Sequence, residues 1–182
     1  MDEKDKKKIS KFLSLILRHA PEVIGLALEE NGWVSVEKLI EACADHGRKF
    51  TFTDLKEVVA TNDKKRFAFN EDETRIRASQ GHSVAVEIEF EKKEPPEILY
   101  HGTAEKNVGL ILAEGLKKMS RHHVHLSSET ETASKVGMRY GKPIIFQVDT
   151  KAMLTEGFEF YVSANGVWLV ESVPPGFLKI NK

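Results

Sequence analysis

The sequence has very little cysteine and no long apolar run. Its single cysteine, Cys43, excludes a disulfide within the 182-residue chain. No apolar stretch approaches the roughly 18 residues that a membrane-spanning helix needs, and the charged start MDEKDKKKISKF lacks the apolar core of a signal peptide. We therefore expect a cytoplasmic protein without a membrane segment. Cys43 falls in the apolar stripe of an expected helix, which predicts a small core residue.

An excess of positive charge is missing as well. The chain has 27 Lys and Arg against 28 Asp and Glu, which gives a formal net charge of -1. Proteins that hold nucleic acid by bulk basicity have a clear positive excess. Any contact with nucleic acid or phosphate must therefore come from a few well-placed cations.

The stretch LILRHAPE near the start of the chain predicts the end of a helix. Apolar residues recur at helical spacing from Ile9 to Ile16. Pro21 disfavours the helical conformation in the residue before it, so this helix should end near Ala20. Successive residues turn by about 100°, which places Arg18 opposite the apolar stripe and His19 at its flank. Both side chains are thus expected at a helix terminus.

Two more helices and a hairpin are expected in the first half. One helix should run from a Ser35 cap to Gly47, and the next should begin at a Thr53 cap. Short strands are expected at 65–69 and 74–78, around a polar turn. Three helices followed by a hairpin is the order of a winged-helix unit, a fold that commonly binds nucleic acid.

The second half has a different pattern, after a charged connection with a Pro-Pro pair in EFEKKEPPEIL. Isolated strands alternate with short helices, which indicates an α+β domain around a split antiparallel sheet. The expected strands are 97–103, 123–128 and 143–149, with the last ones inside 158–172, and the expected helices are 104–116 and 132–141.

Several polar side chains gather in SRHHVHLSSE, namely Arg121, His122, His123 and His125. Three histidines suggest zinc, but the only cysteine is distant and only His123 and His125 would share a strand face. A zinc site needs three or four ligands at suitable spacing. We therefore expect no metal, and interpret this stretch as a strand edge that faces a polar ligand.

Eight motifs occur in one order along the chain: FLSLILRHAPE, GW, KKRF, RIRASQGHS, LYHGTA, HVHLS, VGMRYGKP and NGVWL. Together, from about Ser10 to Trp168, they closely resemble the NAD-dependent RNA 2′-phosphotransferase family, the tRNA-splicing 2′-phosphotransferases. A collinear set of eight motifs is far more specific than any one of them. The resemblance implies a winged-helix RNA-binding lobe at 1–90, joined to an ADP-ribosyltransferase-like, NAD-binding lobe at 91–182.

The resemblance also implies an activity, the removal of an internal 2′-phosphate from RNA with NAD as co-substrate. The phosphate would attack the nicotinamide ribose of NAD+, expelling nicotinamide and forming a 2′-phospho-ADP-ribosylated RNA. The ribose O2″ would then attack phosphorus, giving 2′-OH RNA and ADP-ribose 1″,2″-cyclic phosphate. The implied partner is a tRNA-like RNA, and we expect a monomer without a metal cofactor.

Four residues would carry the chemistry by this resemblance: Arg18, His19, Arg66 and Arg139. Arginine suits phosphate because its planar donors carry a permanent charge. Arg18 would clamp the 2′-phosphate, Arg66 would hold the splice-junction phosphates, and Arg139 would complete the phosphate cage in the second step. His19 would hydrogen-bond the phosphate or protonate the leaving RNA oxygen, and both roles stay open.

Two further sets of residues match motifs of the family. RNA contacts are expected from Lys64, Lys65, Gln80 and His82. NAD contacts are expected from two strands and from the helix between them with its exit: His101, Gly102, Thr103, Asn107, Ile111, Gly115, Leu116, His125, Leu126 and Ser127.

Two other functions stay open from the sequence. One is a winged-helix regulator of DNA with a ligand-sensing second domain, although such proteins usually have a basic stripe that a balanced charge does not favour. The other is an ADP-ribosyltransferase that modifies terminal phosphates or protein. Many toxin-type members of that group carry a catalytic glutamate late in the sheet, where this chain has the apolar NGVWL.

Overall fold

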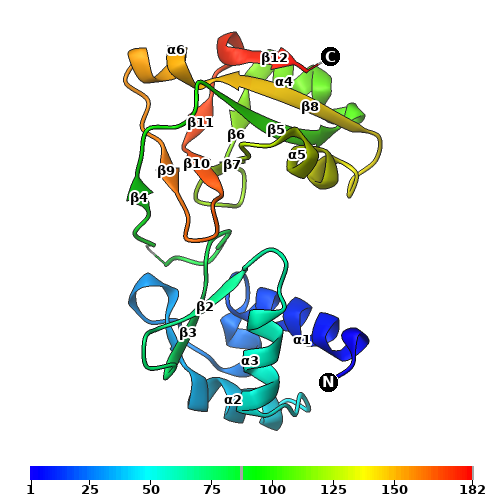
Figure 1. Cartoon of the computed structure of the whole chain (residues 1–182), viewed down its shortest axis with the longest axis vertical. Coiled ribbons are helices and arrows are strands. Elements are labelled where there is room, and N and C mark those ends of the chain that lie inside the picture. The colour runs from blue at the N-terminus through cyan, green and yellow to red at the C-terminus, as the bar shows by residue number, and fades with distance from the viewer. Residues whose placement is uncertain (87, 182) are drawn as a thin grey trace. The chain divides into compact units, whose positions relative to one another are not determined.

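The computed structural model describes residues 1–86 and 88–181 (Figure 1). The chain divides into two compact units, Met1–Glu89 and Phe90–Lys182. Each unit combines helices with small antiparallel sheets. Within the described residues, no helix has the length and apolar character needed to cross a bilayer.

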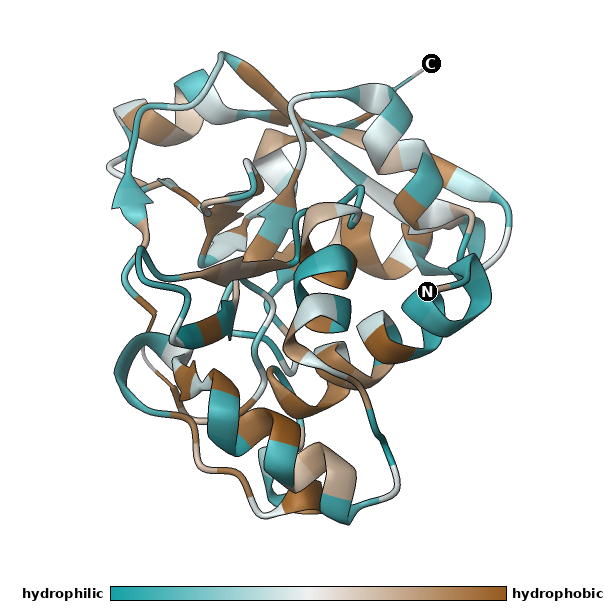
Figure 2. Cartoon of the chain, turned by 60° about the horizontal axis from the view of Figure 1, so that its bottom comes forward, coloured by the Kyte–Doolittle hydropathy of each residue, from teal (hydrophilic) through white to brown (hydrophobic). Residues whose placement is uncertain are grey.

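The first unit packs three helices against a small sheet with strand order β1-β3-β2. Its helices carry hydrophobic residues on one side and polar residues on the other, as the colours of Figure 2 show. The apolar sides meet in one core that includes Leu13, Leu39 and Leu55. The elements are α1 (Glu3–Ile16), η1 (Pro21–Ile24), η2 (Glu30–Gly32), β1 (Val34–Ser35), α2 (Val36–Asp45), α3 (Phe52–Ala60), β2 (Phe67–Phe69) and β3 (Arg75–Ala78).

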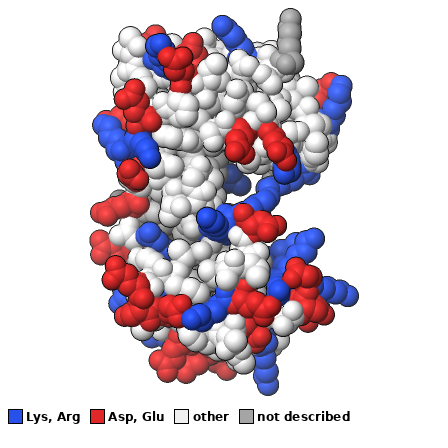
Figure 3. All heavy atoms as spheres, in the orientation of Figure 1, with Lys and Arg blue, Asp and Glu red and all other residues white. Residues whose placement is uncertain are grey.

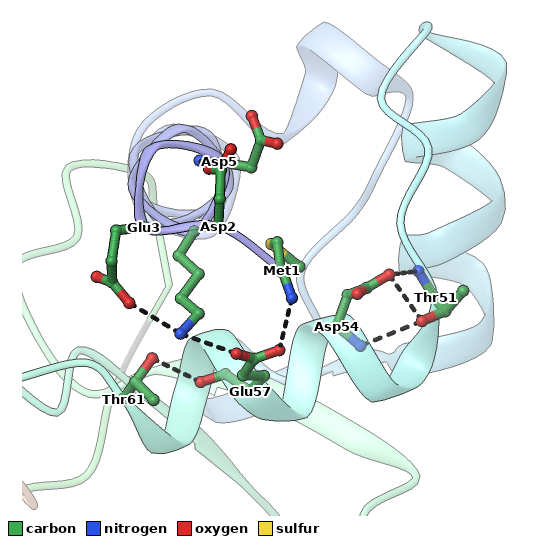
Figure 4. A network of polar contacts seen from close by, with 9 residues as sticks. Met1, Asp2, Glu3, Asp5, Thr51, Asp54, Glu57 and Thr61 are labelled. Atoms are coloured by element: carbon green, nitrogen blue, oxygen red, sulfur yellow. Dashed lines mark hydrogen bonds and ion pairs between the residues drawn. The ribbon is translucent and has the colours of Figure 1, made fainter.

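The helix caps agree with the sequence in one case and differ in another. Ser35 caps α2 as predicted, since its side chain accepts a hydrogen bond from the Lys38 amide. The cap of α3 is Thr51 and not Thr53, because Thr51 and Asp54 form a reciprocal capping box (Figure 4). The prediction of Thr53 was wrong because Asp54, three residues after Thr51, completes the box, whereas Lys56 lies three residues after Thr53.

The lone cysteine lies where the sequence placed it. Cys43 is fully buried in the core of the first unit. Burial disfavours the charged thiolate and raises the pKa of the Cys43 thiol to about 11. This cysteine therefore has a packing role and little nucleophilic character.

The second unit contains two larger sheets and one short strand pair. The strand order is β4-β9-β10-β7 in one sheet and β12-β8-β5 in the other. An isolated β-bridge joins Tyr100 of β5 to Ser127, the residue that follows β7. Its elements are β4 (Glu91–Lys92), β5 (Ile98–Ala104), η3 (Glu105–Asn107), α4 (Val108–Glu114), β6 (Leu116–Lys117), β7 (Val124–Leu126), α5 (Thr130–Gly137), β8 (Pro143–Asp149), α6 (Thr150–Thr155), β9 (Tyr161–Val162), β10 (Trp168–Val170), β11 (Ser172–Val173), η4 (Pro175–Phe177) and β12 (Leu178–Ile180).

Two glycines allow α5 to lie directly on the sheet of β5 and β8 (Figure 1). A Cβ added to Gly102 would lie 1.6 Å from the Ala133 carbonyl oxygen, and one added to Gly137 would lie 2.6 Å from the Thr103 carbonyl oxygen. Only a residue without a side chain fits at either position. Packing of helix on strand thus accounts for a glycine at position 102, which the resemblance had suggested as an NAD contact.

This packing predicts that Gly102→Ala destabilises the protein strongly. The new methyl group would overlap a backbone carbonyl that cannot move without shifting α5, so we expect the free energy of unfolding to fall by about 3 kcal/mol. The measurement is urea or thermal unfolding followed by circular dichroism.

Gly109→Ala is the matched control, because Gly109 lies in α4 with nothing within 4 Å of an added Cβ. In a helix this change should leave stability unchanged or increase it by up to about 1 kcal/mol. Equal stability of the two variants would contradict the packing role of Gly102.

Candidate functional site

The Arg18-His19 pair lies in a turn that follows α1. The helix ends at Ile16, earlier than Pro21 alone predicts, and the His19 amide donates to the Leu15 carbonyl at 2.9 Å. Leu17 is fully buried and anchors the turn in the core. Its neighbour Arg18 is half-buried and His19 is exposed. The turn therefore places a largely buried guanidinium next to an exposed imidazole.

One short stretch of chain, Ser79–Val84, connects this turn to Arg66; we call it the 79–84 segment. At its start the Ser79 amide donates to the Arg66 carbonyl at 2.8 Å. At its end the Ser83 amide donates to the Arg18 carbonyl at 2.8 Å, and Ser83 Oγ lies 2.8 Å from His19 Nδ1. The segment thus links the Arg18-His19 pair to Arg66, which is distant from it in sequence.

The middle of the 79–84 segment is held by burial. His82 is only 2% exposed, and its Nε2 lies 3.1 Å from where a Cβ of Gly32 would be. Gly81 turns the chain with a φ of +84°, a conformation that favours glycine. The sequence suggested His82 as an RNA contact; in the structure its ring supports the segment from inside, while Gln80 is half-buried.

Lys64 and Lys65 lie next to Arg66 and are both exposed. The Arg66 amide donates to Asn62 Oδ1 at 3.3 Å, and the Asn62 side-chain amide donates in turn to Ser10 Oγ of α1 at 2.9 Å. This chain of bonds fixes the backbone of the basic stretch to α1. On the face of the protein seen in Figure 3, Lys and Arg side chains are interspersed with Asp and Glu side chains, so the charge of this face is mixed.

A polar cluster in the second unit forms around His101 of β5 and His125 of β7. His101 Nδ1 lies 3.1 Å from the His125 carbonyl oxygen. Because a carbonyl can only accept, Nδ1 must carry the proton, and Nε2 of the neutral ring is then an acceptor. Burial lowers the pKa of His101, and the nearby positive charge of Arg121 lowers it further, against the opposing effect of the bond to His125. The ring is therefore a hydrogen-bond acceptor at neutral pH.

Arg121 is the site residue that the sequence did not assign. Its guanidinium lies 3.2 Å from His125 Nδ1, so a cation joins the histidine pair. A guanidinium only donates, and His125 Nδ1 is accordingly the acceptor. Arg139, which the sequence suggested, is exposed in the turn after α5, where its amide donates to the Val136 carbonyl. The spacing of Arg121 four residues before His125 was visible, but nothing in the sequence showed that the two side chains meet.

The other dinucleotide candidates separate into core and accessible residues. Ile111, Leu116 and Leu126 belong to the hydrophobic core, and their side chains pack inside the unit. Gly115 is also constrained by packing, since a Cβ there would lie 2.2 Å from the Val173 carbonyl oxygen. The half-buried polar candidates are His101, Asn107, His125 and Ser127, and Asn107 donates to the nearly buried Thr103 hydroxyl at 3.1 Å.

Within residues 1–86 and 88–181, neither a metal-ligand cluster nor the pocket described below includes the candidate residues. In the part of the chain that the structure describes, no three His, Cys, Asp or Glu side chains come together as a possible metal site. A pocket of about 360 Å³ lies against α1 and is lined by Ile9, Phe12 and Phe50 among others. None of the candidate residues lines it, so we base the site on the hydrogen-bonded clusters and not on this pocket.

Comparison with known proteins gives one family. The model of the "RNA 2'-phosphotransferase, Tpt1 / KptA family" matches residues 4–172. A protein of Trichormus variabilis is 56% identical over 178 residues, which is 98% of either chain, and one of Flavobacterium johnsoniae is 56% identical over 179 residues, again 98% of each. A third, from Fusobacterium nucleatum, is 53% identical over 173 residues, 94% of this chain and 97% of its own. All three carry the name "Probable RNA 2'-phosphotransferase".

The positive charge of Arg121 predicts how its removal would change the pKa of His101. In the unchanged protein the His101 ring should titrate below 6.5, and Arg121→Ala should raise that pKa because a nearby positive charge is removed. Titration of the imidazole resonances by NMR measures both values. Arg139→Ala is the matched control and should leave the midpoint unchanged. An Arg121→Ala midpoint equal to that of the unchanged protein would contradict the cluster.

Proposed function

The chain belongs to the RNA 2′-phosphotransferase family, whose model covers residues 4–172, and from this premise we propose that it removes an internal 2′-phosphate from RNA by transferring it to NAD+. In this reaction NAD+ supplies the ribose carbon that accepts the phosphate, and the by-products are nicotinamide and ADP-ribose 1″,2″-cyclic phosphate. The protein must then hold an RNA phosphate and a dinucleotide and stabilise the negative charge that moves between them.

The 79–84 segment is the observation that carries the proposal. It joins the backbones of Arg66 and Arg18 by hydrogen bonds of 2.8 Å, and it contacts His19 through Ser83. Two permanent cations and an imidazole on one such frame are suited to a phosphate, since guanidinium groups bind its oxygens in a planar, two-pronged geometry. We assign the 2′-phosphate to Arg18 and His19, and neighbouring RNA phosphates to Arg66, Lys64 and Lys65.

The chemistry of the reaction fits these side chains. A phosphate dianion is already a nucleophile, so its transfer needs positioning more than a general base. The second transfer leaves negative charge on phosphorus oxygens and on the departing RNA O2′. Arginine donors would stabilise the former, and His19 would donate a proton to the latter.

The polar groups of the second unit fit a dinucleotide. His101 Nε2 is an acceptor for a ribose hydroxyl, and the half-buried Asn107 and Ser127 add amide and hydroxyl groups nearby in the fold. One arginine of this unit would neutralise the negative charge of the NAD+ pyrophosphate or of the transferred phosphate. We assign that role to Arg121, which contacts His125, whereas the order of the motifs alone had suggested Arg139.

We further propose that the two units are a winged-helix RNA-binding lobe and an ADP-ribosyltransferase-like lobe. In the first unit three helices precede the β2–β3 hairpin, and β1 adds a third strand. In the second unit two antiparallel sheets are linked by the single Tyr100–Ser127 bridge, which is consistent with a split sheet.

The activity itself can be tested with a short RNA that bears one internal 2′-phosphate. Incubation with the protein and NAD+ should give 2′-OH RNA, and the small product should have the mass of a cyclic phosphate of ADP-ribose. RNA that gains the mass of ADP-ribose and keeps it would indicate an ADP-ribosyltransferase instead. Unchanged RNA together with intact NAD+ binding would contradict the proposal.

The phosphate assignments predict large losses of activity without loss of the fold. Arg18→Ala, Arg66→Ala and Arg121→Ala should each lower the single-turnover rate by about 10²–10³-fold, which is the typical cost of removing one charge-stabilising donor. Thermal unfolding should stay close to that of the unchanged protein, since none of these side chains belongs to the hydrophobic core.

Arg75→Ala serves as the control in the first unit, because Arg75 is exposed and makes a surface ion pair with Glu29 at 3.1 Å. Arg139→Ala serves as the control in the second unit. A full rate in the Arg18→Ala variant would contradict the assignment of the 2′-phosphate to Arg18. A larger loss of rate for Arg139→Ala than for Arg121→Ala would show that Arg139, and not Arg121, is the phosphate-binding cation of the second unit.

A further inference from the structure

Ser83, in the 79–84 segment, contacts both members of the Arg18-His19 pair. Its amide donates to the Arg18 carbonyl at 2.8 Å, and its hydroxyl lies 2.8 Å from His19 Nδ1. His19 is exposed, and an exposed imidazole exchanges between rotamers unless a partner restrains it. The Ser83 hydroxyl supplies such a restraint from a segment whose other end is bonded to Arg66.

We propose that Ser83 is a positioning residue that holds the His19 ring by Nδ1, so that Nε2 is the nitrogen that serves the RNA phosphate. The inference rests on the proposed function and deepens it. It concerns the geometry of one proton donor and not the identity of the substrate.

The proton balance of the step supports this assignment. In the imidazolium form both ring nitrogens donate, so Ser83 Oγ accepts from Nδ1–H and the second proton is on Nε2. When the bond between phosphorus and RNA O2′ breaks, the electron pair stays on O2′ and the Nε2 proton moves to it. Nδ1–H remains bonded to Ser83, so the ring need not turn between the two states.

The surroundings of Ser83 make it a firm support. The preceding residue, His82, is buried against Gly32, and the Ser79 hydroxyl donates to the Lys65 carbonyl at 3.0 Å. On the other side of Ser83, the Val84 amide donates to the Arg18 carbonyl at 3.4 Å, so the backbone that carries the Ser83 hydroxyl is held before and after it. A side chain on a freely moving loop could not orient an imidazole in this way.

Ser83→Ala tests the inference directly. Removing a hydrogen bond to a charged ring should lower the single-turnover rate about 10–100-fold, with the RNA concentration at half-saturation little changed. Ser83→Thr keeps the hydroxyl and should retain most of the rate. Ser14→Ala is the matched control, since it removes a serine hydroxyl of the same unit that donates to the Ser10 carbonyl within α1.

A double-substitution cycle separates positioning from a merely structural effect. If Ser83 acts through His19, Ser83→Ala should have no further effect on the rate in a His19→Ala background. An equal loss in both backgrounds would overturn the inference. A full rate for Ser83→Ala in otherwise unchanged protein would overturn it as well.

A spectroscopic measurement keeps this test independent of turnover. The ¹⁵N shifts of the His19 ring report its tautomer and hydrogen bonding, and they should change in Ser83→Ala but not in Ser14→Ala. Unchanged His19 shifts would exclude the contact. If the unchanged protein shows no turnover, the proposed function fails, while these shifts still decide whether Ser83 orients His19.

Discussion

The backbone carbonyls of Arg18 and Arg66 organise the first unit, because both accept a hydrogen bond from the 79–84 segment. Their residues come from different elements, one after a helix and one before a strand. The hydrogen bonds that hold both residues to the 79–84 segment are made by main-chain atoms. These bonds fix the backbone from which each charged side chain extends, as a binding site with a defined geometry requires.

Three histidines in the candidate site differ in the partner that faces Nδ1. His101 faces a carbonyl, His125 faces a guanidinium and His19 faces a hydroxyl. A carbonyl can only accept and a guanidinium can only donate, so the first two rings have their roles set by chemistry. A hydroxyl does both, so the contact with Ser83 is compatible with either protonation state of the His19 ring. This agrees with the acid-base role that we propose for His19.

The sequence predicted regular elements better than it predicted which side chains meet. The strand at 143–149 was correct to the residue, and Ser35 was the cap of its helix, because both depend on local preferences. Pro21 restricts only its immediate neighbour, so it could not show that the first helix ends at Ile16, several residues before the proline. The contact of Arg121 with a histidine and the burial of His82 depend on tertiary packing, which spacing does not contain.

The inert thiol of Cys43 has a consequence for the study of motion in this protein. Thiol reagents need an accessible thiolate, and this one is buried and resists ionisation. Since the sequence contains a single cysteine, a new cysteine on the surface of either unit can be labelled without replacing the native one. Pairs of dyes or spin labels, one on each unit, can then measure whether the distance between the units changes when RNA or NAD+ is added.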